Sequence, residues 1–235
     1  MYSKEVFMTT KIASSMPVRT ALVCLAMLGA GQTMAQTLTG NVTNREGNGG
    51  WIADITFATG SSSVYGATGV IACIEPGADF PALPSTHTYD VVDAASVINA
   101  SATYANKADA LMNWVVDHYY TQTLAWNIDG QDFNQVLWEI TQDFTGTASS
   151  MAFNTGAVQS TRTDYETMLS ELKSAYSSIS DTYRSSTFQV HYLVDRDTRY
   201  QNMILVTAVP EPSTYLMMFA GVGALLVWRR RSGAR

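Results

Sequence analysis

Two stretches, 107–120 (KADALMNWVVDHYY) and 132–143 (DFNQVLWEITQD), decide the fold class. In both, apolar side chains return at helical spacing along one stripe, which predicts two amphipathic helices. Asp129 or Asp132 is placed to cap the second of them. A third stretch of the same kind, 164–178 (DYETMLSELKSAYSS), follows. The middle of the chain is therefore expected to be helical.

Strand patterns lie on both sides of these helices. Residues 51–57 (WIADITF) alternate between apolar and polar side chains, as a half-buried strand does. Residues 70–74 predict a second strand, and 38–42 an edge strand. After the helices, 186–194 and 199–209 are expected to pair as a hairpin that turns at 195–198. Strands, then helices, then strands predict one α+β domain with antiparallel strands at both ends.

The expected exported domain, 36–208, has the length of a single domain with a substantial core. Residues 36–209 carry eighteen acidic and seven basic side chains, a net charge of −11. An acidic surface favours solubility outside the cell and argues against a nucleic-acid partner.

The first 35 residues have the pattern of a secretory signal peptide. A basic start is followed by the uncharged apolar run 21–31 (ALVCLAMLGAG) and then by small residues, with a cleavage site after Ala35. The lead is long, so Met8 or Met16 is an alternative start. Cys24 lies inside the apolar run without the small residue that a lipoprotein signal needs before it, so no lipid anchor is expected.

The C-terminal segment 209–235 has three parts. Val209, Pro210, Glu211 and Pro212 come first, the apolar run 214–228 follows, and Arg229, Arg230 and Arg231 close it. The run predicts a short transmembrane helix, and the arginine cluster predicts that the C-terminus stays in the cytoplasm. An ordinary tail anchor is the plain alternative.

This tail resembles the PEP-CTERM sorting signal, also catalogued as the ice-binding protein C-terminal domain. The resemblance implies recognition by a membrane-embedded exosortase and cutting near Pro210, Glu211 and Pro212. It implies a Gram-negative bacterium that makes exopolysaccharide, with export through the Sec translocon. Whether the helix is removed stays open.

Within 36–209 there is one cysteine, Cys73, which cannot form an internal disulfide. The three histidines, His87, His118 and His191, show no metal-ligand spacing, and no G-x-S-x-G nucleophile elbow is present. No metal, cofactor or catalytic residue is therefore expected. Cys73 is either a small buried hydrophobe at a strand end or a reactive thiol.

The segments around Cys73 (GVIACIEPG), 108–120 and 133–156 (FNQVLWEITQDFTGTASSMAFNTG) resemble those of Cys-Gln thioester domains. That resemblance implies a bond between the Cys73 thiol and a glutamine amide, open to attack by a partner's amine or hydroxyl. The family's glutamine stands four residues before the tryptophan, where this chain has Asn134. Either Gln135 supplies the amide, or the domain has the fold without the bond.

These observations predict a non-enzymatic exported surface or extracellular-matrix protein, anchored in the inner membrane before processing. The expected function is attachment to a partner, covalent through Cys73, with exopolysaccharide or a surface amine or hydroxyl as the target. The alternatives are a passive structural component of the exopolysaccharide layer with an inert Cys73, and a secreted hydrolase.

Overall fold

The computed structural model describes residues 36–44, 52–58, 65, 67–99, 103–209 and 220–221. The expected signal peptide at 1–35, the arginine cluster and all but two residues of the run 214–228 lie outside these ranges. Within the ranges, no helix combines the length and the apolar character that crossing a bilayer requires.

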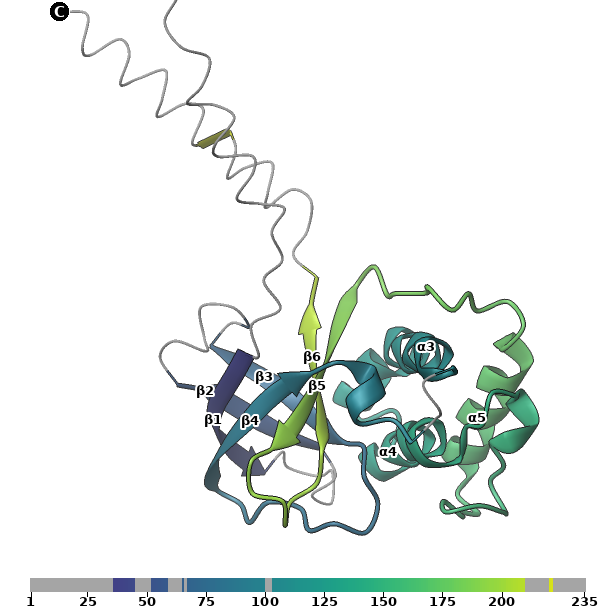
Figure 1. Cartoon of the computed structure of the whole chain (residues 1–235), viewed down its shortest axis with the longest axis horizontal. Coiled ribbons are helices and arrows are strands. Elements are labelled where there is room, and N and C mark those ends of the chain that lie inside the picture. Colours follow the sequence, from purple (N-terminus) through teal and green to yellow (C-terminus); the bar gives the residue numbers. More distant parts are fainter. Residues whose placement is uncertain are drawn as a thin grey trace, which may run out of the picture. The chain divides into compact units, whose positions relative to one another are not determined.

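Six strands close into an antiparallel barrel in the order β1-β2-β3-β6-β5-β4 (Figure 1). Their bounds are β1 Gln36–Asn44, β2 Ile52–Phe57, β3 Thr68–Cys73, β4 Ser85–Val92, β5 Phe188–Asp195 and β6 Met203–Ala208. Alternate residues of each strand face the barrel interior because the side-chain period of a strand is two. Closure leaves no strand with an unpaired edge.

The strand register fixes which side chains share the interior. Leu38 pairs with Tyr89, Ala53 with Ile71, and Cys73 with Met203. These six residues are all buried. The interior is thus one continuous core that ends, on the side where β3 stops and β6 starts, in a layer of polar residues.

The helices α3 Ala105–Leu124, α4 Gly130–Trp138 and α5 Thr163–Ala175 lie together on one side of the barrel (Figure 1). Short 3-10 turns are found at Ala94–Ser96 and Ala148–Ser150. The helix α3 packs against β5, and α4 packs against β2 and β3. Asp129, one of the two expected caps, accepts a hydrogen bond of 2.8 Å from the backbone N–H of Gln131.

The expected helix at 132–143 changes its winding before its end. Residues Glu139–Asp143 form a π-helical turn, closed by a hydrogen bond of 3.0 Å from the N–H of Phe144 to the carbonyl of Glu139. The hydroxyl of Thr141 donates to the carbonyl of Ile74 at 2.8 Å. The wider turn therefore ties the helix to the chain just after β3.

The mixed helix and strand architecture and the final hairpin are confirmed, since β5 and β6 pair antiparallel. The prediction of an edge strand at 38–42 is wrong, because β1 pairs with β2 on one side and with β4 on the other. The strand β4 was not expected: its sequence, STHTYDVV, places polar side chains on both faces.

Candidate functional site

Cys73 is the last residue of β3 and points into the barrel. Its register partner on β6 is Met203, and its side chain is fully buried. It is a free thiol, and burial raises the pKa of that thiol well above its ordinary value. Cys73 is therefore held neutral in a water-poor interior unless a neighbouring group takes its proton.

Gln201 lies two residues before Met203 on the chain that forms β6. Residues at such a diagonal position across an antiparallel pair have Cα atoms about 7–8 Å apart, within reach of a long side chain. Gln201 is only 4% exposed. The strand register therefore brings a buried carboxamide into the neighbourhood of the Cys73 thiol.

The loop after β3 fixes this carboxamide. The Nε2 of Gln201 donates to the carbonyl of Ala78, and its backbone N–H donates to the carbonyl of Asp79 at 3.1 Å. The Oε1 atom is buried and has no hydrogen-bond partner among the described residues. A buried amide oxygen without a hydrogen-bond partner destabilises the folded state, so the presence of Gln201 at this buried position needs an explanation.

The two carboxamides expected from the sequence, Gln135 and Asn134, both lie on α4 and are both buried. Since α4 packs on β2 and β3, the structure brings this helix to the same side of the barrel as Cys73. The Oε1 of Gln135 also has no hydrogen-bond partner among the described residues. Three buried carboxamides are therefore candidates for the amide partner of Cys73, and the sequence had predicted two of them, Gln135 and Asn134.

Sequence reasoning missed Gln201. The sequence did contain a signal for it. Gln201, Met203 and Leu205 alternate at strand spacing, so Gln201 is a polar residue on the face that the two apolar residues turn inward. Cys73 and β6 are far apart in the sequence, and only the strand pairing shows that they are neighbours.

Tyr89 faces Cys73 from the opposite wall. The strands β3 and β4 are three places apart in either direction around the six-strand barrel. Burial, then Asp195, then Cys73 raise the pKa of the Tyr89 hydroxyl. This hydroxyl is buried and has no hydrogen-bond partner among the described residues.

A chain of hydrogen-bonded side chains lies at the same end of the barrel. His87 Nδ1 is 2.6 Å from Asp195 Oδ2, and His87 Nε2 is 2.8 Å from Ser85 Oγ. The ring of Tyr200 meets the imidazole edge to face, with centroids 4.8 Å apart. All four residues line a surface depression of about 640 Å³. Of the three histidines, His87 is therefore the one at the Cys73 end.

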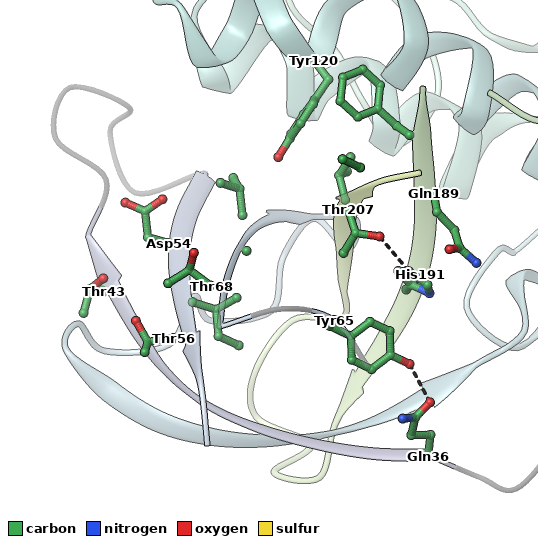
Figure 2. A pocket seen from close by; sticks show the side chains of 16 residues that line it. Gln36, Thr43, Asp54, Thr56, Tyr65, Thr68, Tyr120, Gln189, His191 and Thr207 are labelled. Carbon is green, nitrogen blue, oxygen red and sulfur yellow. Dashed lines mark hydrogen bonds between the residues drawn. The ribbon is translucent and has the colours of Figure 1, made fainter. Parts of the chain in front are cut away.

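The larger depression, about 1190 Å³, is at the other end of the barrel (Figure 2). Figure 2 shows the Tyr65 hydroxyl donating to Gln36 Oε1 at 2.8 Å, and His191 Nε2 bonded to Thr207 Oγ1 at 3.1 Å. Burial lowers the pKa of His191. This depression brings together none of the expected site residues.

The histidines and acidic residues of the described ranges form no group of three that could hold a metal ion. His118 stacks on Trp114, with ring centroids 3.9 Å apart, on the exposed face of α3.

A comparison with protein families matches the C-terminal segment. Residues 208–231 match the model of the PEP-CTERM protein-sorting motif, which confirms the expected sorting signal. No curated protein matches the chain.

Several solved structures are similar to this one. The N-terminal thioester domain of a surface protein from Clostridium perfringens is 11% identical, with a TM-score of 0.45 over 74% of this chain and 100% of that one. The N-terminal thioester domain of fibronectin-binding protein SfbI from Streptococcus pyogenes is 12% identical, with a TM-score of 0.47 over 77% and 97%. The N-terminal domain of the Streptococcus pyogenes pilus tip adhesin Cpa is 10% identical, with a TM-score of 0.44 over 76% and 97%.

Proposed function

We propose that this chain is an exported surface protein, processed by an exosortase, whose barrel domain attaches covalently to a partner through an internal thioester. The observation that carries the proposal is a buried free thiol, Cys73, whose cross-strand partner Met203 lies two residues after a buried carboxamide, Gln201. The sorting motif supports the processing step.

The chemistry balances without a cofactor. The Cys73 sulfur attacks the side-chain carbonyl carbon of Gln201, the C–N bond breaks, and ammonia leaves with the thiol proton. A partner's amine or hydroxyl later attacks the same carbon and the C–S bond breaks. The partner is then joined to Gln201, and Cys73 is a thiol again.

Burial and rigidity favour this reaction at this place. A thioester inside the barrel is shielded from water, which would otherwise hydrolyse it. The hydrogen bond from Gln201 Nε2 to Ala78 holds the side-chain amide and the backbone bond to Asp79 holds the main chain, and such ordering raises the effective concentration of the two groups. The Tyr89 hydroxyl, buried without a partner among the described residues, is available as a donor to the acyl oxygen.

Among the three carboxamides, strand register favours Gln201. It is two residues from the direct cross-strand partner of Cys73, whereas Gln135 and Asn134 belong to a helix that packs on the outside of the strands. Asn134 also has a side chain one carbon shorter than glutamine. Gln135 stays the second candidate, and Asn134 the third.

The test is the intact mass of the 36–209 fragment before and after methylamine. We expect a mass lower than the sequence predicts by one ammonia, and then addition of one methylamine at Gln201. The variants Cys73→Ala and Gln201→Ala should show the full mass of their sequences. Gln135→Ala and Asn134→Ala are the matched controls and should keep the deficit.

Two results would contradict parts of the proposal. If only Gln135→Ala or Asn134→Ala abolishes the deficit, the thioester exists but α4 supplies the amide. If the unmodified fragment has its full sequence mass and Cys73 is alkylated once unfolded, no thioester forms.

The alternative function is a passive structural component of the exopolysaccharide layer with an inert cysteine. The full burial of Cys73 and the raised pKa of its thiol favour it, because a neutral, shielded thiol is unreactive. For either function we propose export by the Sec translocon, transient attachment to the inner membrane, and delivery to the cell surface or matrix. The net charge of −11 over residues 36–209 is consistent with a soluble surface domain.

A further inference from the structure

The side chains of Ser85, His87 and Asp195 form a hydrogen-bonded series. With Asp195 as a carboxylate and His87 as the neutral imidazole, Nδ1 of His87 donates to Asp195 and Nε2 is left to accept a hydrogen bond. Ser85 supplies a hydroxyl at 2.8 Å from that nitrogen. The second oxygen of Asp195 accepts the N–H of Asp197 at 2.8 Å. His87 is therefore oriented to take a proton from a hydroxyl group.

These three side chains lie at the same end of the barrel as Cys73 and Gln201. The ring of Tyr200, the residue directly before Gln201, packs against the His87 imidazole. On β4, His87 and Tyr89 share the inward face, and β4 stands opposite β3, the strand of Cys73. The depression at this end is lined by Ser85, His87 and Tyr200. A group that enters this depression from solvent meets His87, at the end of the barrel that holds Cys73 and Gln201.

The charged groups around this depression are already paired. Arg196 bonds to Asp90 at 2.7 Å, and Arg199 bonds to Asp197 at 2.6 Å. Asp195 is engaged by His87. A rim whose cations and anions neutralise one another offers little attraction to a charged amine or an anion. It suits a neutral partner that presents hydroxyl groups, such as a saccharide.

We propose that His87 is the general base for a partner hydroxyl that attacks the thioester, so that the partner is a hydroxyl-bearing saccharide rather than an amine. The proposal rests on the thioester function proposed above. The hydroxyl takes the place of the Ser85 side chain and gives its proton to His87 Nε2. An O–C bond forms at Gln201, the C–S bond breaks, and the imidazolium returns the proton to the Cys73 thiolate.

The test compares two nucleophiles on the full chain purified in detergent: glycerol for hydroxyls and methylamine for amines. The variant His87→Gln keeps a donor for Asp195 but cannot accept the proton. General bases contribute roughly 100-fold or more, so we expect the glycerol rate to fall about 100-fold. The free amine of methylamine is nucleophilic without a base, so its rate should change less than about threefold. Ser85→Ala tests whether Ser85 is itself the reacting hydroxyl, and it should react with glycerol at least as fast as the unmodified chain. The matched control is His191→Gln, in the other depression, and neither of its two rates should change.

The mass deficit of the unmodified chain is measured first. Without it there is no acyl carbon for His87 to serve, and both proposals fall together. If the mass deficit is present, an equal loss of both rates in His87→Gln overturns the role of His87 but not the thioester. A slower glycerol reaction in Ser85→Ala also overturns the role of His87, because Ser85 would then be the reacting hydroxyl. If His87→Gln does not fold, solvent deuterium decides: the glycerol reaction of the unmodified chain should be slower in D₂O and the methylamine reaction should not, and equal rates for glycerol overturn the proposal.

Discussion

The stability of this domain should fall as the pH rises through the acidic range, because of Glu139. This carboxyl is fully buried in the π-helical turn. It accepts hydrogen bonds from the Tyr165 hydroxyl at 2.5 Å and from the N–H of Ala152 at 3.1 Å. Burial raises its pKa from 4.5 to about 7, although the hydrogen bond from Tyr165 opposes the shift.

The sign and the size follow from linkage. The folded state holds the Glu139 proton more tightly than the unfolded chain, so the free energy of unfolding decreases between the unfolded pKa of 4.5 and the folded pKa of about 7. At roughly 1.4 kcal/mol for each unit of pKa, the loss across this window is at most about 3 kcal/mol. Below pH 4.5 Glu139 makes its full contribution to the free energy of unfolding, and above about pH 7 this free energy falls no further on its account.

Urea unfolding of the 36–209 fragment between about pH 4 and pH 8 measures this loss, with Glu139→Gln as the comparison. Glutamine cannot titrate, and with its Oε1 accepting from the Ala152 N–H and its NH₂ donating to the Tyr165 hydroxyl it mimics the protonated acid, so the two proteins should differ by less than about 1 kcal/mol at low pH. As the pH rises the unmodified protein loses stability and Glu139→Gln does not, so the difference between them should grow. Glu171→Gln, at an exposed position, is the control and should follow the unmodified protein. Parallel curves for the unmodified protein and Glu139→Gln would refute the reasoning.

Three further substitutions test the packing near the site, each by the urea midpoint. Thr141→Val removes the donor to the Ile74 carbonyl and should cost about 1–3 kcal/mol, and no change would mean that water replaces the bond. Gly40→Ala places a methyl group 2.6 Å from Ile55 Cγ1, so we expect a loss of about 1–3 kcal/mol; a neutral result would show that β1 and β2 can separate freely. Gly77→Ala meets no atom within 4 Å but has φ +94°, so a loss of about 1–2 kcal/mol from backbone strain alone is expected, and unchanged stability would contradict it.

The helices could be predicted from the sequence because each buries a regular stripe. The strand at 51–57 and the final hairpin follow from the same kind of local periodicity. The neighbours of 38–42 could not be predicted, since alternation shows that one face of a strand is buried and not how many strands flank it. Barrel closure, which decides this, depends on pairing between segments 49 residues apart, such as Thr39 with Thr88.

The polar end of the barrel was the hardest part to predict. The strand β4 carries the polar residues Ser85 and His87 on its inward face. Apolar residues at these positions would have given the alternating pattern by which a strand is predicted. Gln201 is hidden for the same reason. Cys73 was identified because it is the one cysteine of 36–209, and Gln135 and Asn134 because a resemblance placed them. Side chains that replace core residues for chemistry weaken the very signal by which a strand is recognised.

The direction of β6 has a mechanical consequence. The strand starts two residues after Gln201 and ends at Ala208, where the sorting motif begins. A partner bonded to Gln201 and an anchor beyond Val209 would pull on the two ends of this single strand. Tension would run along its backbone, while β3 and β5 on either side carry almost none of it. The domain could then hold a load without unfolding, whereas a bond at Gln135 would draw α4 away from the barrel.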